Sequence, residues 1–183
     1  MALAAVAALC SGVCSGAGAG RPTVNGLPVV SGAFSILYVH SIYKAPSAEV
    51  FTVEGRRFTM RAVVSANESV LDYYELDGTR TRTPDGAWVL RLAEPATYEE
   101  LSLLTTSIGR RTLASGGRCL PLYPASGAAR VRLTVEARLD VRSEPCGPSY
   151  SQSFFLKTVY SHTDTAAVRI SETQKPHCWP SPG

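Results

Sequence analysis

The residues of this 183-residue chain that are best suited to chemistry are two cysteines, Cys119 and Cys146. Such a pair can form a disulfide, can remain as two free buried thiols, or can include a reactive thiolate, which the neighbouring Arg118 would favour at Cys119. An oxidising compartment favours the disulfide, and the beginning of the chain points to such a compartment. If the two cysteines pair, the closed loop stabilises the fold by about 3 to 4 kcal/mol.

Sequence motifs for catalysis are absent. The chain has no Gly-x-Ser-x-Gly, no phosphate-binding P-loop, no dinucleotide-binding fingerprint and no HExxH. Three histidines are too few for an evident zinc site or triad, and Cys10 and Cys14 have no histidine or carboxylate beside them in the sequence. We therefore expect no enzymatic activity, no cofactor, no metal site and no small-molecule substrate.

Two groups of residues are candidates for binding another protein. Aromatic side chains are common in protein interfaces, although packing in the core is the stronger expectation for those found here, Tyr73, Tyr74 and Trp88. The second group consists of the arginines on one face of a predicted strand, Arg130, Arg132, Arg138 and Arg142. These arginines suit an acidic partner surface, and a plain solvated face is the alternative. A net charge of +3 with dispersed arginines argues against nucleic-acid binding.

The element that positions the cysteines is a strand predicted over residues 130–142. Its apolar residues alternate without a break with charged or polar ones, at Val131, Leu133, Val135, Ala137, Leu139 and Val141. A period of two places all of them on one face, as in a strand with one face on a core and the other in water. Turn residues flank the strand, so the cysteines lie just outside its two ends.

The rest of the chain predicts an all-β protein, an antiparallel sandwich with one short helix. Residues 34–92 read as a meander of about five strands, with turns at Glu54-Gly55, Asp77-Gly78 and Asp85-Gly86, and His40 is expected to be packed or solvated. The predicted strands cover 34–43, 50–53, 57–64, 70–76 and 88–92. A capping box of Thr97 and Glu100, followed by Leu101, Leu104 and Ile108 at helical spacing, predicts a helix over 97–109.

The ends of the chain indicate processing and a tail. Residues 1–20 are small or apolar and uncharged, as in a secretory signal peptide, and residues 21–33 read as an irregular lead-in. The single domain is expected over 34–170, with further extended runs at 154–160 and 166–170 and a flexible tail over 171–183. Asn67 begins a glycosylation sequon, and Cys178 would remain as an odd thiol. We expect the endoplasmic reticulum lumen or secretion.

The order of these segments resembles a known family. The sequence Thr-x-Glu-Glu-Leu at 97–101, Arg-Cys-Leu-Pro at 118–121, the amphipathic strand, Pro-Cys-Gly at 145–147 and SFFLKTVYSHTDTAAV at 153–168 are similar to the lumenal domain of subunit 10 of the ER membrane protein complex. The resemblance covers about residues 34–170, and its identical residues are concentrated between Gly116 and Cys146. This chain has a shorter spacing between its cysteines, and it lacks the C-terminal membrane span of that family.

The resemblance implies a β-sandwich in which Cys119 and Cys146 are the family's disulfide pair. It also implies a non-catalytic subunit whose partners are other proteins of a complex that inserts tail-anchored and multipass proteins into the ER membrane. The chain would reach the membrane only through those partners or through a span absent from this sequence. The alternative is a free secreted sandwich that binds a protein partner.

Overall fold

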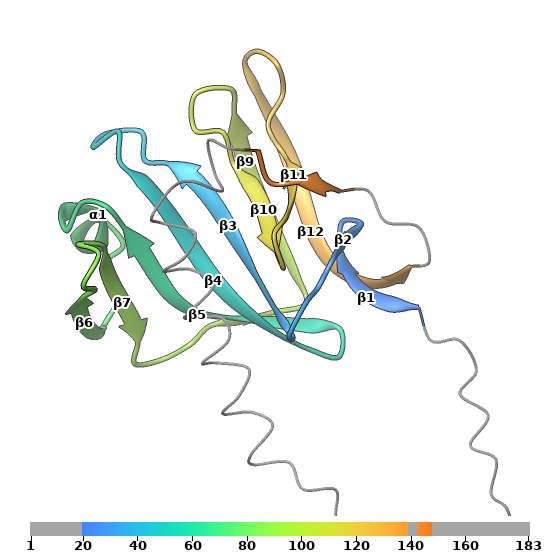
Figure 1. The fold of residues 1–183 in the computed structure, drawn as a ribbon, viewed down its shortest axis with the longest axis horizontal. Helices are drawn as coiled ribbons and strands as arrows, with labels where there is room; N and C mark the ends of the chain where they lie inside the picture. Colours follow the sequence, from blue (N-terminus) through green and yellow to red (C-terminus); the bar gives the residue numbers. More distant parts are fainter. Residues whose placement is uncertain (1–19, 139–142, 148–183) are drawn as a thin grey trace, which may run out of the picture.

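The computed structural model describes residues 20–138 and 143–147. Two antiparallel sheets form a sandwich, as the sequence predicts (Figure 1). In spatial order, the larger sheet contains β13 (Glu144–Pro145), β11 (Arg118–Pro121), β10 (Thr112–Ser115), β3 (Ala33–Val39), β4 (Pro46–Glu54), β5 (Arg57–Ser65), β7 (Trp88–Leu92) and β6 (Gly78–Arg82), and β8 (Thr97–Tyr98) also pairs with β5. The smaller sheet contains β2 (Leu27–Pro28), β1 (Arg21–Val24), β12 (Ala128–Arg138) and β9 (Glu100–Thr106).

The predicted meander is the centre of the larger sheet. β3, β4 and β5 are consecutive neighbours, with the predicted turn at Glu54-Gly55 joining the last two. The predicted turn at Asp85-Gly86 joins β6 to β7, so that hairpin is also confirmed. Asp77-Gly78 is not a hairpin turn, because Gly78 begins β6 and pairs with Leu92. A Cβ atom at Gly78 would lie 2.0 Å from the carbonyl oxygen of Arg91, so the close approach of β7 requires glycine there.

The alternation between the cysteines forms β12, which lies between β1 and β9 in the smaller sheet. Leu133 and Val135 are buried in the core, and Val131 packs against it. Arg130 and Arg132, on the opposite face, are exposed. The prediction of a two-faced strand is therefore confirmed as far as Val135, whereas Ala137, predicted on the buried face, is exposed. Nothing is described of the side chain of Arg138, and residues 139–142 lie outside the described part.

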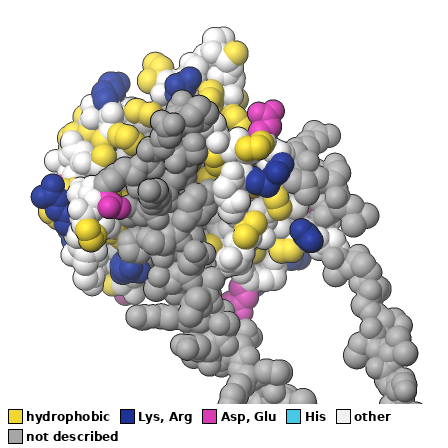
Figure 2. All heavy atoms as spheres, viewed as in Figure 1, with side chains coloured by type: hydrophobic (Ala, Val, Ile, Leu, Met, Phe, Trp, Pro, Cys, Tyr) yellow, Lys and Arg dark blue, Asp and Glu magenta, His cyan; other side chains and the backbone are white. Residues whose placement is uncertain are grey.

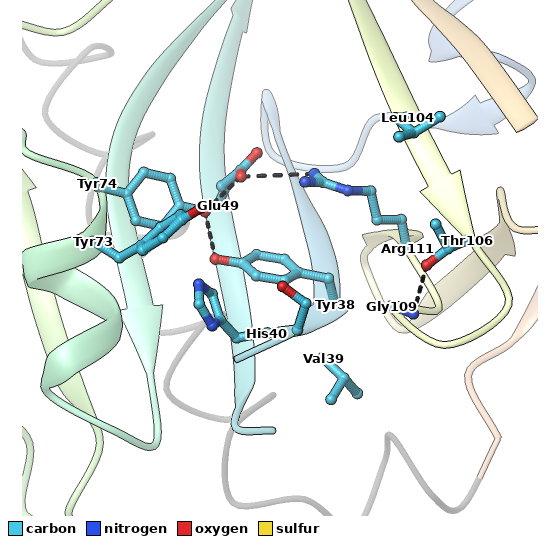
Figure 3. A pocket seen from close by; sticks show the side chains of 11 residues that line it. Tyr38, Val39, His40, Glu49, Tyr73, Tyr74, Leu104, Thr106, Gly109 and Arg111 are labelled. Atoms are coloured by element: carbon cyan, nitrogen blue, oxygen red, sulfur yellow. Dashed lines mark hydrogen bonds and ion pairs between the residues drawn. The ribbon is translucent and has the colours of Figure 1, made fainter. Parts of the chain in front are cut away.

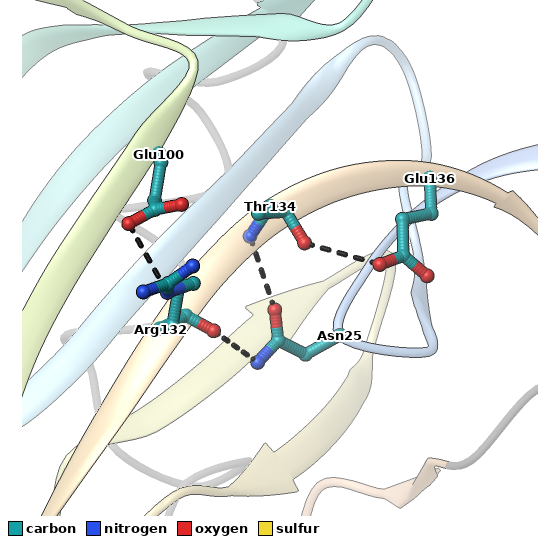
Figure 4. A network of polar contacts seen from close by, with 5 residues as sticks. All are labelled: Asn25, Glu100, Arg132, Thr134 and Glu136. Atoms are coloured by element: carbon teal, nitrogen blue, oxygen red, sulfur yellow. Dashed lines mark hydrogen bonds and ion pairs between the residues drawn. The ribbon is translucent and has the colours of Figure 1, made fainter.

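Residues 21–33 are more regular than expected, because β1 and β2 form a hairpin with Asn25-Gly26 at the turn. The amide of Asn25 continues the ladder between β1 and β12 beyond the end of β1 (Figure 4). Its Nδ2 donates to the carbonyl oxygen of Arg132 at 2.8 Å, and its Oδ1 accepts from the backbone N–H of Thr134 at 3.2 Å. A side-chain amide thus takes the place of a peptide group, which local sequence patterns do not reveal.

The helix predicted over 97–109 is wrong, because these residues form β8 and β9 and cross from one sheet to the other. The hydroxyl of Thr97 contacts that of Thr59 on β5 at 2.9 Å instead of capping a helix, and Glu100 pairs with Arg132 at 3.1 Å. Leu101 and Leu103 also have a period of two, and both face the core. Threonine and isoleucine in this segment favour a strand once a neighbouring strand is present.

The short helix lies elsewhere, at α1 (Ser69–Tyr73), where the sequence predicts a strand over 70–76. Asn67 begins the turn, because its Oδ1 accepts from the backbone N–H of Ser69 at 3.0 Å. Val70 and Leu71 are buried, and α1 contacts β5 and β7 at one end of the larger sheet (Figure 1). The first predicted strand also ends at Val39 rather than at residue 43.

The core between the sheets is built on three aromatic rings from adjacent strands. Phe34 and Phe51 stack with ring centroids 4.9 Å apart, and Phe58 meets both edge-on at 5.6 and 5.7 Å. All three are fully buried. Leu103, Leu133 and Val135 from the smaller sheet belong to the same cluster, so both sheets contribute to one core.

Cys119 and Cys146 form a disulfide, with sulfur atoms 2.07 Å and Cα atoms 4.9 Å apart. Cys119 lies in β11, and Cys146 follows β13, the two-residue strand that pairs with β11 at the edge of the larger sheet. The covalent bond thus fastens the chain after β12 to that edge. Several predicted segments lie outside the described residues: residues 1–19 of the signal peptide predicted over 1–20, the runs at 154–160 and 166–170, the tail over 171–183, and Cys10, Cys14 and Cys178.

Candidate functional site at the open end of the sandwich

Large apolar side chains are exposed around one end of the sandwich. The described residues of this group are Ile42, Tyr43, Tyr73, Leu104 and Ile108, which we call the rim. Tyr73 is 60 % and Ile108 70 % exposed, which is high for side chains of this kind. Exposed apolar side chains that gather around a hollow are typical of a protein-binding surface, whereas single ones are ordinary.

Two turns hold part of the rim in place. Residues 40–45 join β3 to β4, and the backbone N–H of His40 donates to the carbonyl oxygen of Ala45 at 2.9 Å. The turn after β9 carries Ile108, and the carbonyl oxygen of Gly109 accepts from the N–H of Val39 at 2.8 Å. Because this bond joins the end of β3 to the other turn, the two turns form one edge of the same opening.

Inside the rim is a hollow of about 460 Å³. Residues from β3, β4, α1, β9 and the start of β10 surround it, and they include Tyr38, Glu49, Tyr74 and Arg111 (Figure 3). Tyr38 and Glu49 occupy inward positions on strands whose other inward residues are apolar, such as Phe34 and Phe51. The interior of the sandwich therefore changes from apolar to polar along the same two strands.

The polar side chains form one connected network. The Tyr74 hydroxyl donates to Oε1 of Glu49 at 2.7 Å and accepts from the hydroxyl of Tyr38. From the other side, Nη1 of Arg111 lies 3.7 Å from the same carboxylate oxygen, and the guanidinium lies 5.2 Å from the ring centre of Tyr38. Figure 3 shows Glu49 between Tyr74 and Arg111. Buried charge is tolerated here because the carboxylate has both a donor and a cation beside it.

The surroundings keep both tyrosines neutral. Burial, followed by the negative charge of Glu49, raises the pKa of Tyr38 and of Tyr74 far above the ordinary value for tyrosine. Each hydroxyl therefore keeps its proton at physiological pH and serves as a hydrogen-bond donor. Nη1 of Arg111 is buried and has no hydrogen-bond partner among the described residues, so its charge is balanced by Glu49 only across the longer distance.

His40 connects the hollow to the rim. Its ring stacks on Tyr43 at 5.2 Å and meets Tyr73 edge-on at 4.9 Å, and its Nδ1 accepts from the backbone N–H of Tyr43 at 3.3 Å. Burial lowers the pKa of His40. The sequence predicted that His40 is either packed or solvated, and the structure shows it packed against two aromatic rings.

The predicted aromatic residues have different roles. Tyr73 belongs to the rim, and Tyr74 belongs to the buried network. Trp88 is half-buried against the core, with the Arg82 guanidinium 5.3 Å from its ring centre. Of the three, only Tyr73 is mostly exposed.

The arginine face is less cationic than its sequence suggests. Arg132 pairs with Glu100 at 3.1 Å, and Glu136 lies two positions further along the same face of β12 (Figure 4). Arg130 is exposed opposite Leu104 of the rim. Arg138 is the last residue of β12, and nothing is described of its side chain, while Arg142 lies outside the described residues. On another face, Figure 2 shows basic and acidic side chains scattered singly.

Asn67 lies in the short segment between β5 and α1 and is half-buried. Its Oδ1 is held by the backbone N–H of Ser69, while a glycan would be attached through Nδ2. Within the described ranges, no group of three or more histidine, cysteine or acidic residues is arranged to hold a metal. The same part of the chain contains no helix with the length and hydropathy needed to cross a bilayer.

Most residues of this site were not predicted from the sequence. Ile42, Tyr43, Leu104 and Ile108 were assigned to strand or helix, and Tyr38, Glu49 and Arg111 were not singled out. One signal was available, because Tyr38 continues the inward series of Phe34 and Ile36 at a period of two. A polar group in such a series indicates a polar region of the core, although its partners lie on other strands.

Residues 34–122 match the model of a domain of unknown function, DUF1850. This range runs from β3 to the residue after β11, and it contains every residue that lines the hollow. No curated protein and no solved structure matches the chain.

Proposed function

We propose that this protein is a non-catalytic subunit that acts by protein contact through the rim. Its place is the lumenal side of the ER membrane protein complex, which inserts tail-anchored and multipass proteins. The observation that carries the proposal is the group of exposed apolar side chains, Ile42, Tyr43, Tyr73, Leu104 and Ile108, around one opening. The assignment to this complex rests on the family resemblance of residues 34–170.

The composition of the opening supports a protein partner. Tyrosine and arginine are enriched among the residues that dominate binding energy. Here Tyr73 and Arg111 line the hollow, and Tyr43 stacks on His40, which also lines it. The hollow is large enough for one or two side chains of a partner. Because Glu49 balances Arg111 and both buried tyrosines are neutral, the site favours an apolar or aromatic side chain over a strongly charged one.

The disulfide supports the proposed compartment. A bond between Cys119 and Cys146 persists where thiols are oxidised, as in the ER lumen and outside the cell. The sequon at Asn67 adds a second test of the same compartment. Treatment with an endoglycosidase should increase the mobility of the protein on a gel, and the Ser69→Ala variant should show no such change.

A test of the proposed function compares two matched variants of the full chain. Tyr73→Ser with Ile108→Ser removes two rim side chains, whereas Val30→Ser removes an exposed apolar side chain outside the rim. Tagged protein is recovered from detergent-solubilised membranes of its own cells, and the other subunits of the complex are measured by quantitative mass spectrometry. We expect the rim variant to lower their recovery about tenfold or more and the control to leave it unchanged.

The alternative is a free secreted protein that uses the same rim to bind a partner outside the cell. In that case the chain is found in the medium, and no subunit of the membrane complex accompanies it. If the rim variant recovers the subunits of the complex as well as the control does, the rim is not the contact. The assignment to the complex would then still stand. Absence of the complex from all samples would reject the assignment itself.

A further inference from the structure

Each sheet ends in two edge strands, and these edges differ in how well they are protected. Within the described residues, the edge strands are β13 and β6 in the larger sheet and β2 and β9 in the smaller one. β13 and β2 are two residues long, and each contains a proline, Pro145 and Pro28. β6 is exposed throughout and carries Arg80 and Arg82. Short length, proline and positive charge are ordinary means of preventing an edge strand from pairing with another chain.

β9 lacks these protections. It is seven residues long and contains no proline, lysine or arginine. Its one charged residue, Glu100, is paired with Arg132 of the neighbouring strand, and its Leu104 is 59 % exposed. A long edge strand with an exposed leucine is typical of an edge that pairs with a strand from outside the molecule.

The hydrogen bonds of β12 show which of its residues point to β9. Asn25 lies on the β1 side of β12 and bonds the carbonyl oxygen of Arg132 and the backbone N–H of Thr134 (Figure 4). Along an antiparallel strand, the N–H and C=O groups of successive residues point to opposite neighbours. The N–H and C=O of Val131, which is next to Arg132, therefore point to β9.

The same alternation leaves free peptide groups on the outer side of β9. Val131 is opposite Leu103, so the N–H and C=O of Leu103 face β12. Those of Ser102 and Leu104 face the open edge, about 7 Å apart along the strand. No described residue bonds them. An extended peptide carries an N–H and a C=O at this spacing, so its backbone matches the edge.

This edge is also one wall of the hollow. Leu104 and Thr106 line the hollow from β9, Tyr73 and Tyr74 line it from the opposite side, and Tyr38 lies between them (Figure 3). A strand that pairs with β9 therefore lies over the hollow. Because successive side chains of a strand point to opposite faces, every second side chain of the added strand points into the hollow.

The outward side chains of an added strand lie near a basic residue. Arg130 is opposite Leu104, it is exposed, and no acidic side chain pairs with it in the part of the chain that the structure describes. An added strand is two strand spacings from β12, or about 10 Å. An arginine and a glutamate side chain can bridge that distance together. The outer positions beside Leu104 therefore favour an acidic side chain, whereas the hollow favours an apolar or aromatic one.

We propose that the partner binds as an extended segment that adds a fifth strand to the smaller sheet, beside β9. Its inward side chains are apolar or aromatic and enter the hollow, and its outward side chains are acidic and lie near Arg130. This proposal rests on the proposed function and specifies how the partner is bound. Pairing of the backbones supplies affinity, and the alternate side chains supply specificity.

Proline substitution tests the pairing, because proline has no N–H. Ser102→Pro removes one donor from the open edge and leaves the ladder between β9 and β12 intact. Arg82→Pro is the control at the edge of β6, where the N–H of the next residue, Thr83, bonds Ala87 within the hairpin and that of Arg82 faces outward.

Both variants of the full chain are used in the recovery experiment that tests the proposed function. We expect Ser102→Pro to lower the recovery of the other subunits about tenfold or more and Arg82→Pro to leave it unchanged. Retention of the Cys119–Cys146 bond and an unchanged midpoint of chemical denaturation show that each variant is folded.

Amide hydrogen exchange tests the same pairing in the unaltered chain, so its result does not depend on the folding of a variant. The free chain and the recovered complex are transferred to heavy water, and exchange at single residues is read by mass spectrometry with electron-transfer fragmentation. We expect the N–H groups of Ser102 and Leu104 to exchange about tenfold or more slowly in the complex. The N–H of Leu103, which already faces β12, should change little.

Different results overturn this proposal and the proposed function. Full recovery with Ser102→Pro and unchanged exchange at Ser102 and Leu104 reject the added strand, while the rim remains the contact if the rim variant lowers recovery. Absence of the complex from samples of the unaltered chain rejects the proposed function and this proposal with it. A dimer of the free chain in sedimentation that Ser102→Pro converts to a monomer means that a second copy occupies the edge, which also rejects the proposal.

Discussion

The two ends of the sandwich interior differ in composition although they are built on the same strands. At one end, β3 and β4 direct Phe34 and Phe51 inward, where they stack with Phe58. At the other end, the same strands direct Tyr38 and Glu49 inward, where they meet Tyr74, which follows α1, and Arg111, which precedes β10. At the apolar end the rings fill the interior and are fully buried, whereas the polar end borders a hollow. Strand geometry sets which side chains point inward, and their chemistry decides whether that part is a core or a site.

The largest effect is expected from a change at the apolar end. Phe51→Ala leaves a cavity between two other phenylalanine rings and should lower the free energy of unfolding by about 4 kcal/mol. Chemical denaturation measures this loss. The matched change at the polar end, Tyr38→Ala, should cost less, because that end already borders a hollow. Equal losses would contradict the distinction between the two ends.

The next effect concerns the buried carboxylate. Glu49→Ala leaves the Tyr74 hydroxyl without its acceptor and Arg111 without its counter-charge, so we expect a loss of about 2 kcal/mol. Glu49→Leu combined with Arg111→Met removes both charges and should recover most of that loss. A double variant that is less stable than Glu49→Ala would show that the pair itself stabilises the fold.

A smaller effect is expected when only one hydroxyl is removed. Tyr74→Phe keeps the ring and deletes the hydrogen bonds to Glu49 and Tyr38, which should cost about 1 kcal/mol. Tyr43→Phe removes a hydroxyl from a rim ring outside this network and serves as the control. If both variants unfold at the same denaturant concentration, the network contributes little to stability.

The smallest expected effect is a pH dependence of stability that arises from His40, which lies at the edge of the polar end. Burial lowers the pKa of His40 below its ordinary value of 6.5, so the unfolded chain binds this proton more readily than the folded one. The stability from neutral His40 is present above pH 6.5 and is lost as the pH falls toward the folded-state pKa. Protonation of Nδ1 also removes the acceptor for the Tyr43 N–H.

Melting curves at about pH 7.5 and about pH 5.5 measure this dependence. We expect a small fall in Tm at the lower pH and a smaller fall in His40→Asn, which keeps a polar group without the titration. The variant also separates His40 from the other two histidines of the chain. An equal fall in both proteins would exclude His40 as the cause.

The sequence predicted β12 and, in the larger sheet, the β4–β5 and β6–β7 hairpins because the relevant forces are local. Alternation at a period of two and the turns at Glu54-Gly55 and Asp85-Gly86 determine a strand and its register over a few residues. Residues 97–109 show the limit of local reasoning. Their leucines fit both a helix and a strand. These residues form strands because β8 pairs with β5 and β9 pairs with β12.

The site was beyond prediction for a related reason. The sequence places Tyr38 on the inward side of its strand, but it contains no signal that Glu49, Tyr74 and Arg111 converge on one point. Arg111 follows a turn after β9, and Tyr74 follows α1, which the sequence predicted as a strand. The rim has the same origin, because Tyr73, Leu104 and Ile108 were assigned to the wrong elements.

The sequence alone is enough to predict an all-β protein, a two-faced strand over 130–142, which overlaps β12 (Ala128–Arg138), and the segments that carry Cys119 and Cys146. These features follow from the alternation of side chains along one strand and from turn residues, which act over short distances. Local patterns do not reveal that the larger sheet is apolar on both faces or that one end of its interior is polar. Both properties depend on which strands become neighbours, and that choice is made by packing between residues far apart in the chain.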